Sequence, residues 1–237
     1  MIDKIKNNWT IILVGVIIFV VVGIIVFEEV LFPSEQASTQ VSQIPQIQGE
    51  QENGDDISFV IAPGDYYRGS RDAEIVFIEY SDLECPYCKR FHSTMKQVID
   101  EYGDQVLWVY RHFPLDSHPN AQKASEAAEC VGKYFGNDAF GEFTDLYFSR
   151  TTSNGYGFPT ANLAALATEV GADKNIIQGC IDSGEMAEKV ATDFQEGINS
   201  GVTGTPGTIL IEPDGQSQVV SGAIPYEQIK QVIESLL

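Results

Sequence analysis

A single stretch, Ile75–Cys88 with the sequence IVFIEYSDLECPYC, constrains most strongly what this chain can fold into. It opens with a mostly apolar run, Ile75–Tyr80, which is typical of a strand buried on both faces. Two cysteines three residues apart follow, and Pro86 suits a first helical turn, where an N–H would have no intrahelical partner. Apolar residues then recur at helical spacing up to Tyr102. The stretch therefore predicts a strand leading into a helix that carries a Cys-x-x-Cys pair at its start.

The rest of the globular region predicts a mixed α/β domain. A second strand is expected at Gln105–Phe113, and a strand, a helix and a strand in this order imply a right-handed parallel crossover. Helical spacing from Asn120 to Gly201 predicts about four helices, and hence an inserted helical subdomain at about 117–201. The last expected elements are the strands Thr208–Ile211 and Gln218–Ser221, a hairpin turn at Pro213–Gly215, and a helix from Pro225 that buries Ile229, Val232, Ile233 and Leu236.

An uncharged, apolar segment, residues 9–27, precedes this domain. As a helix it would span roughly 28 Å, close to the thickness of a hydrocarbon core. Lysines precede it and glutamates follow it, so the positive-inside rule places residues 1–8 in the cytoplasm. A cleaved signal peptide is the alternative, but no Ala-x-Ala pattern follows Phe27. We predict a transmembrane anchor at 9–27, a flexible linker at 28–56, and an extracytoplasmic domain at 57–237 at the cell membrane.

Chain length and net charge limit the number of domains and the kinds of partner that the chain can bind. The 237 residues allow one or at most two domains with a sizeable core. Lys and Arg number 14 against 34 Asp and Glu, so the formal net charge is −20. Such a charge repels nucleic-acid backbones and anionic lipid headgroups alike. We therefore expect no nucleic-acid partner, and contact with the membrane only through the N-terminal helix.

The cysteine pair is compatible with redox chemistry or with half of a zinc site. Zinc would need two more ligands, and the sequence has no second Cys-x-x-Cys or Cys-x-x-His; we interpret His92 as a packed or solvated helix residue. Cys85, exposed at the helix start, is the predicted nucleophile, because unpaired N–H groups and the helix dipole lower a thiol pKa there. Cys88, on the apolar face, is the predicted resolving thiol, and no metal is expected.

Three segments in order resemble the DsbA-like branch of the thioredoxin superfamily: EYSDLECPYCKRF at 79–91, HPNA at 118–121 and GVTGTPGT at 201–208. The resemblance covers roughly residues 64–237. It implies a thioredoxin-like α/β fold with an inserted helical subdomain. It also implies a protein thiol:disulfide oxidoreductase that needs no cofactor beyond its redox-active disulfide, Cys85–Cys88.

The resemblance gives Glu79 a role, as the buried acid that thioredoxin-like proteins place behind the active site. A carboxyl group there would have a raised pKa and could exchange a proton with Cys88. The alternative is an ordinary strand residue whose side chain reaches solvent. Its apolar neighbours favour the buried position.

The resemblance also assigns Thr205–Pro206 to a cis-proline loop that faces the disulfide and binds an extended substrate peptide. Together with Pro86 and Tyr87, between the cysteines, it forms the predicted substrate-binding surface. A plain turn in a glycine-rich loop is the alternative. Gly207 differs from the bulkier residue expected after this proline.

Two further cysteines, Cys130 and Cys180, both fall in the predicted helical insertion. In an exported domain we expect them to form a structural disulfide, with two buried free thiols as the alternative. Closing a loop of about 50 residues would stabilise the fold by roughly 4 kcal/mol in the chain-entropy model.

The main functional hypothesis is a dithiol oxidase that introduces disulfides into exported proteins through Cys85–Cys88 and is reoxidised by a membrane partner or a small-molecule oxidant. Tyr87 replaces the histidine of the strongly oxidising members, and Asp82 and Glu84 add negative charge beside the pair. These residues predict a milder oxidant and keep a reductase or isomerase as the alternative. A third hypothesis is a binding module that holds a metal or partner through the two cysteines and His92.

Overall fold

The computed structural model describes residues 61–154 and 157–237. The predicted cytoplasmic N-terminus (1–8), anchor (9–27) and linker (28–56) lie outside the described residues. Within the described ranges, no helix is both long enough and apolar enough to cross a bilayer.

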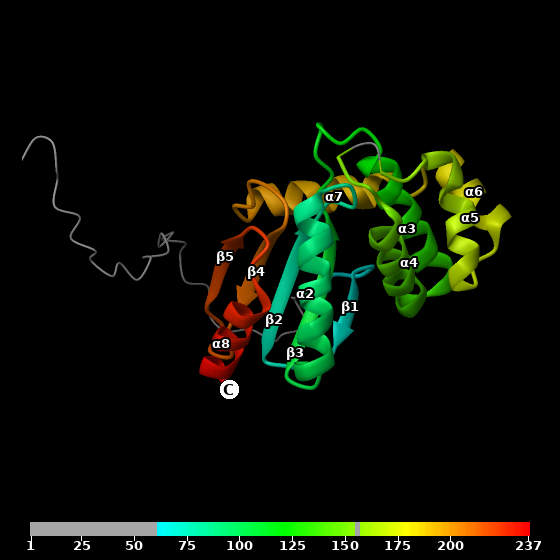
Figure 1. Ribbon diagram of the computed structural model, residues 1–237. Coiled ribbons are helices and arrows are strands. Elements are labelled where there is room, and N and C mark those ends of the chain that lie inside the picture. Colours follow the sequence, from blue (N-terminus) through cyan, green and yellow to red (C-terminus); the bar gives the residue numbers. More distant parts are fainter. Residues whose placement is uncertain (1–60, 155–156) are drawn as a thin grey trace, which may run out of the picture. The chain divides into compact units, whose positions relative to one another are not determined.

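A five-stranded sheet in the order β1-β3-β2-β4-β5 forms the centre of the domain (Figure 1). β2 (Ile75–Ser81) and β3 (Val106–His112) are parallel and fully buried, as the sequence predicts. β4 (Gly207–Ile211) pairs antiparallel with β2 and forms a hairpin with β5 (Ser217–Ser221). β1 (Tyr66–Gly69) pairs antiparallel with β3 and was not predicted from the sequence, because four half-exposed residues carry no periodic pattern.

Helices cover both faces of this sheet. α2 (Pro86–Tyr102) and α8 (Tyr226–Leu236) pack on one face and contact each other (Figure 1). α7 (Ala187–Asn199) contacts β2 and β3 from the other face. In α8 the structure corrects one expectation: Ile229 is buried, but Val232 is 38% exposed.

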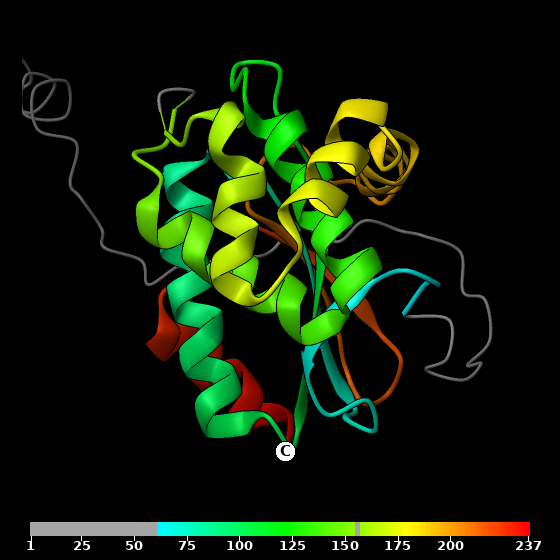
Figure 2. The same cartoon turned by 90° about the vertical axis from the view of Figure 1, so that its right-hand side faces the viewer.

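The helical insertion between β3 and β4 contains α3 (Ala121–Phe135), α4 (Asn137–Arg150), α5 (Leu163–Ala167) and α6 (Lys174–Ser183), followed by α7. The first four lie together beyond the β1 edge of the sheet (Figures 1 and 2). About four helices were expected and five α-helices are described, together with two short 3-10 turns. The five-residue α5 is too short to give a helical period in the sequence.

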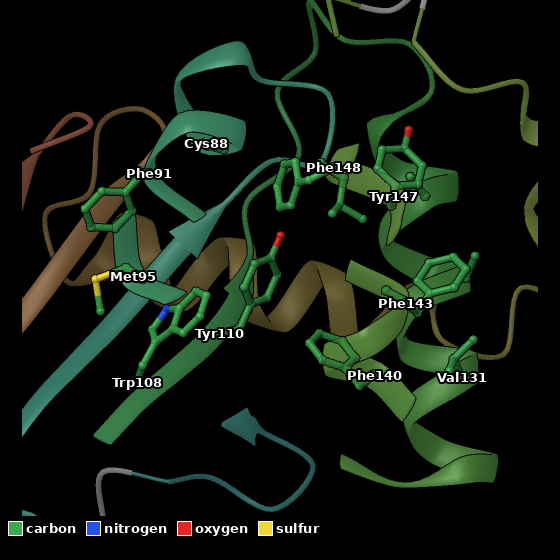
Figure 3. Close-up of a cluster of buried hydrophobic side chains, with 14 of the residues drawn as sticks. Cys88, Phe91, Met95, Trp108, Tyr110, Val131, Phe140, Phe143, Tyr147 and Phe148 are labelled. Atoms are coloured by element: carbon green, nitrogen blue, oxygen red, sulfur yellow. The ribbon is translucent and has the colours of Figure 1, made fainter. Parts of the chain in front are cut away.

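The alternation of side chains along β2 divides the core in two. Ile75 and Phe77 join the larger cluster, which lies between the sheet, α2 and the insertion, whereas Val76 and Ile78 join a smaller one on the α7 side. Figure 3 shows the larger cluster, in which aromatic rings of β3 meet those of α4. The helical insertion and one face of the sheet therefore share the larger cluster.

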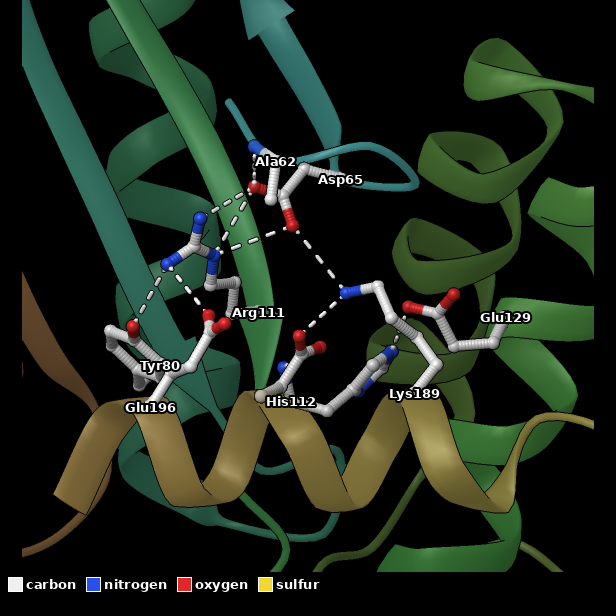
Figure 4. A network of polar contacts seen from close by, with 9 residues as sticks. Ala62, Asp65, Tyr80, Arg111, His112, Glu129, Lys189 and Glu196 are labelled. Atoms are coloured by element: carbon white, nitrogen blue, oxygen red, sulfur yellow. Dashed lines mark hydrogen bonds and ion pairs between the residues drawn. The ribbon is translucent and has the colours of Figure 1, made fainter. Parts of the chain in front are cut away.

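A network of charged side chains joins α7 to the sheet (Figure 4). The Arg111 guanidinium donates to Asp65 at 2.7 Å and to the Tyr80 hydroxyl at 3.0 Å. Lys189 of α7 pairs with Asp193 at 2.5 Å and with Asp65 at 3.4 Å. The charges buried here are paired, which offsets the cost of removing them from water.

A disulfide links Cys130 of α3 to Cys180 of α6, with a Cα–Cα distance of 6.0 Å. It confirms the predicted pairing and rules out two free thiols at these positions. The bond closes a loop of 50 residues within the helical insertion.

Candidate active site

The two remaining cysteines are free thiols at the start of α2. Cys85 is the N-cap residue, with extended backbone angles (φ −76°, ψ 125°), and Pro86 opens the helix. Cys88 lies one turn further in and is fully buried. The expectation of an exposed Cys85 is wrong: the residue is 3% exposed, and its Sγ lies 3.5 Å from the Thr205 carbonyl oxygen, to which the protonated thiol donates. Cys85 is covered because a loop from far along the chain closes over the helix start.

The pKa values of the two thiols are shifted in opposite directions. Hydrogen bonding from Cys88 is the largest cause that lowers the pKa of Cys85 to about 6. Burial works against this shift, while Thr205 and the backbone N–H groups of Tyr87 and Cys88 reinforce it. Burial and the neighbouring Cys85 raise the pKa of Cys88 well above its ordinary value. The reduced pair therefore holds a thiolate on Cys85 and a proton on Cys88 at neutral pH.

Glu79 is completely buried in β2, which excludes the solvent-exposed alternative. Burial raises its pKa to about 7. The indole Nε1 of Trp108 donates to Glu79 Oε2 at 2.9 Å, whereas Oε1 has no hydrogen-bond partner among the described residues. The charge of Glu79 in turn raises the pKa of Cys88. A carboxyl group that titrates near neutral pH and acts on Cys88 is suited to exchanging a proton with it.

We expect Glu79→Gln to change how stability depends on pH. Glu79 has a higher pKa in the folded protein than in the unfolded chain, so it lowers the free energy of unfolding as pH rises from about 4.5 to about 7. Glutamine does not ionise. The stability of the variant relative to the wild type should therefore improve by about 3 kcal/mol between about pH 4 and about pH 8. Urea denaturation at a series of pH values measures this difference.

Glu74→Gln is the matched control, because Glu74 is an exposed acid just before β2. It should leave the pH dependence of unfolding close to that of the wild type. A Glu79→Gln difference that stays constant with pH would contradict the raised pKa.

The Thr205–Pro206 peptide bond is cis, as the resemblance implies. The Pro206 carbonyl oxygen accepts from the N–H of Gly222, which ties the loop to the end of β5. A Cβ atom on Gly207 would lie 2.6 Å from Val202 Cγ1, so close packing explains why no bulkier residue follows the proline. Thr205 reaches Cys85 through its carbonyl oxygen, which places this loop against the nucleophile.

Pro86 and Tyr87, between the cysteines, are both exposed. Tyr87 is the more prominent, at 56% exposure, and the Arg90 guanidinium lies 5.1 Å from its ring centre. Next to a covered Cys85, these side chains form the accessible surface of the Cys-x-x-Cys turn, the position expected for substrate contact.

The two acids beside the pair are closed off from water. Asp82 and Glu84 are both 0% exposed, and each accepts hydrogen bonds from the helical insertion, through His118 and Asn120. In the sequence, His118 and Asn120 were noted only as part of the HPNA segment, with no role assigned. Trp108 was also missed, although the two-residue period of β3 would place it on the same face as Glu79.

The contacts of His92 are with residues other than the two thiols. Its Nε2 is 2.6 Å from Asp145 Oδ1, and its ring packs against Trp108 and Phe148. Across residues 61–154 and 157–237, no group of three or more His, Cys, Asp or Glu side chains is placed to hold a metal ion. His92 is therefore a packed core residue hydrogen-bonded to a carboxylate, which agrees with the packed and not the solvated alternative from the sequence.

A thioredoxin-like sheet, whose β2 strand runs into a Cys-x-x-Cys helix facing a cis-proline, defines the class of thiol:disulfide oxidoreductases. Residues 62–235 match the protein-family model described as Thioredoxin, and the chain belongs to this family. Within it, the described domain is of the DsbA type.

Solved structures support this assignment. DsbA2 of Pseudomonas aeruginosa is 25% identical, with a TM-score of 0.63 over 74% of this chain and 96% of that chain. The alpha-DsbA1 of Wolbachia pipientis is also 25% identical, with a TM-score of 0.63 over 76% of this chain and 94% of its own. Oxidised BdbD of Bacillus subtilis, at 21% identity and a TM-score of 0.64 over 73% and 92% of the two chains, supports the fold alone.

Curated relatives include proteins named as Na(+)/H(+) antiporters. NhaA 1 of Mycobacterium sp. (strain KMS) is 43% identical over 91 residues, 36% of this chain, and NhaA 3 of Salinispora tropica is 33% identical over 143 residues, 60% of this chain. The matches span only 15% and 21% of those proteins. Antiporter activity, which is named for the whole relative, is therefore not transferred to this chain.

Proposed function

We propose that this protein is a membrane-tethered, extracytoplasmic dithiol oxidase that introduces disulfides into exported proteins through Cys85–Cys88. The observation that carries the proposal is the placement of the two thiols: Cys85 lies at the N-cap of α2, where its pKa is lowered to about 6, whereas Cys88 is buried one turn further in, where its pKa is raised. A stabilised Cys85 thiolate favours the reduced form of the pair. The corresponding disulfide is then a better oxidant.

In the proposed reaction, a substrate thiolate attacks the Cys85 sulfur of the oxidised pair. The Cys85–Cys88 bond breaks, a mixed disulfide forms, and Cys88 leaves with the bonding electron pair. Glu79, whose pKa of about 7 leaves it partly protonated at neutral pH, is placed to supply the proton that Cys88 takes up. A second substrate thiolate then attacks the substrate sulfur of the mixed disulfide and releases Cys85 as a thiolate.

Each cycle moves two electrons from the substrate to the cysteine pair, so a membrane partner or a small-molecule oxidant must accept them before the next turnover. The exposed Pro86 and Tyr87 and the cis-proline loop would hold the substrate as an extended peptide. The apolar segment at 9–27 and the charges that flank it support tethering with this domain outside the cytoplasm.

The reduction potential of the Cys85–Cys88 pair tests the proposal. We expect a value above the roughly −270 mV of thioredoxin and below the roughly −120 mV of DsbA, because Tyr87 replaces the histidine of the strongly oxidising members. Equilibration with glutathione redox buffers, followed by alkylation of the remaining thiols, gives this value. A potential at or below that of thioredoxin would instead identify a reductase, and bound zinc or copper without redox activity would identify a binding module.

A further inference from the structure

Two carboxylates lie immediately before the nucleophile in the chain and are closed off from water. Asp82 and Glu84 are both 0% exposed. Burying an ionised carboxylate is costly unless donors replace its hydration, and a negative charge near Cys85 opposes a thiolate there. The pKa of Cys85 is nevertheless lowered to about 6. The contacts of the two acids show how their burial is compensated and how Cys85 keeps a lowered pKa beside them.

Asp82 receives a donor at each carboxylate oxygen. Its Oδ1 accepts from the backbone N–H of Glu84 at 2.7 Å. Its Oδ2 accepts from the backbone N–H of Leu115 at 2.8 Å and lies 2.8 Å from Nδ1 of His118. Leu115 and His118 precede α3, so the helical insertion supplies both donors to Oδ2.

The helical insertion also supplies the donors that hold Glu84. The backbone N–H of Asn120 donates to Oε2 at 3.3 Å, and the Asn120 side-chain amide donates to Oε1 at 3.4 Å. The backbone N–H of Asn154, after α4, donates to the Glu84 carbonyl oxygen at 2.8 Å. Segments 36 and 70 residues away thus converge on the residue before Cys85.

The backbone of Asp82 connects this arrangement to both thiols. Its N–H donates to Cys88 Sγ at 3.4 Å, and its carbonyl oxygen accepts from the N–H of Cys85 at 3.0 Å. A shift of Asp82 would therefore move hydrogen bonds at both cysteines. The contact with His118 therefore holds in place a residue whose backbone is hydrogen-bonded to both cysteines.

We propose that His118 and Asn120 are positioning residues of the redox site, which stabilise the Cys85 thiolate by binding the carboxylates of Asp82 and Glu84. The donors hold each negative charge in a fixed place and compensate it, so the charge opposes the thiolate less. The HPNA segment is thereby part of the active site, although it belongs to the helical insertion. The assignment holds for either direction of electron flow and goes beyond the proposed oxidase role.

The thiol pKa of Cys85 tests the assignment without any substrate, so its result is independent of whether the protein is an oxidase. In the reduced protein, the ultraviolet absorbance of the thiolate follows the titration. We expect His118→Leu to raise the Cys85 pKa by about one unit, a tenfold fall in the thiolate-to-thiol ratio. If thiolate stability sets the redox equilibrium, the reduction potential should fall by about 30 mV, the conversion for a tenfold change.

His118→Gln keeps a side-chain donor and should restore part of the shift. In an Asp82→Asn background, His118→Leu should change the thiol pKa much less, since its target charge is gone. His92→Gln is the matched control: His92 also pairs with a carboxylate, that of Asp145, but among residues 61–154 and 157–237 it forms no hydrogen bond or ion pair with Asp82 or Glu84. A folded His118→Leu variant, verified by circular dichroism, with an unchanged thiol pKa would overturn the proposal, as would an equal shift in His92→Gln.

Discussion

Replacing Cys85 with alanine should reduce thiol:disulfide exchange to the uncatalysed background rate. Cys85 carries the thiolate of the pair, because its pKa is lowered to about 6 while that of Cys88 is raised. The remaining Cys88 is fully buried and protonated at neutral pH, so it cannot replace the lost nucleophile. The effect is measured as the rate at which the protein oxidises a reduced two-cysteine peptide, monitored by the loss of free thiols.

Cys88→Ala is the companion variant and should behave differently. It keeps the reactive thiolate but has no resolving thiol. With a disulfide-bonded peptide, Cys85 should attack one sulfur, release the other as a thiolate, and remain in a mixed disulfide that accumulates. Electrophoresis without reductant would show this adduct as a band that disappears on reduction. Adducts formed by Cys85→Ala, or equal turnover by both variants, would contradict the assignment of nucleophile and resolving thiol.

The second large effect concerns stability. Replacing both Cys130 and Cys180 with alanine should lower the free energy of unfolding by about 4 kcal/mol, because the open loop of the unfolded chain regains its conformational entropy. The bond links α3 to α6, so the loss should fall on the helical insertion. Urea denaturation of the wild type and the double variant measures the difference.

Added reductant provides the control for this experiment. It should destabilise the wild type by a similar amount and leave the double variant nearly unchanged, provided that the Cys85–Cys88 pair is reduced in every sample. Equal stability of the two proteins without reductant would show that the disulfide contributes little.

Local patterns in the sequence were sufficient for the elements that carry the thiols. The apolar run at β2 and the helical spacing after Cys88 each lie within one element, where burial and periodicity are visible in consecutive residues. The four-residue β1 and the five-residue α5 are shorter than the patterns that identify a strand or helix. β1 was therefore missed, and α5 was not separated from the neighbouring helices.

The site itself was only partly predictable. The resemblance pointed to Glu79 and to the cis bond before Pro206, and the structure shows a buried acid and a cis peptide at these positions. The exposure expected for Cys85 was wrong, because a local argument about a helix start cannot include Thr205, which lies 120 residues away. The two-residue period of β3 gives the face on which Trp108 lies, but the register that brings its indole to Glu79 is set by the pairing of β2 with β3.

The sequence by itself determined the reactive unit, a buried strand running into a Cys-x-x-Cys helix, and the class of chemistry that this unit performs. Only the tertiary structure decided the electrostatic environment of the thiols. The Trp108 donor to Glu79 and the His118 donor to Asp82 come from residues 29 and 36 positions away. Charge and hydrogen bonding act over a few ångströms in space, and distance along the chain does not reveal which groups will be neighbours.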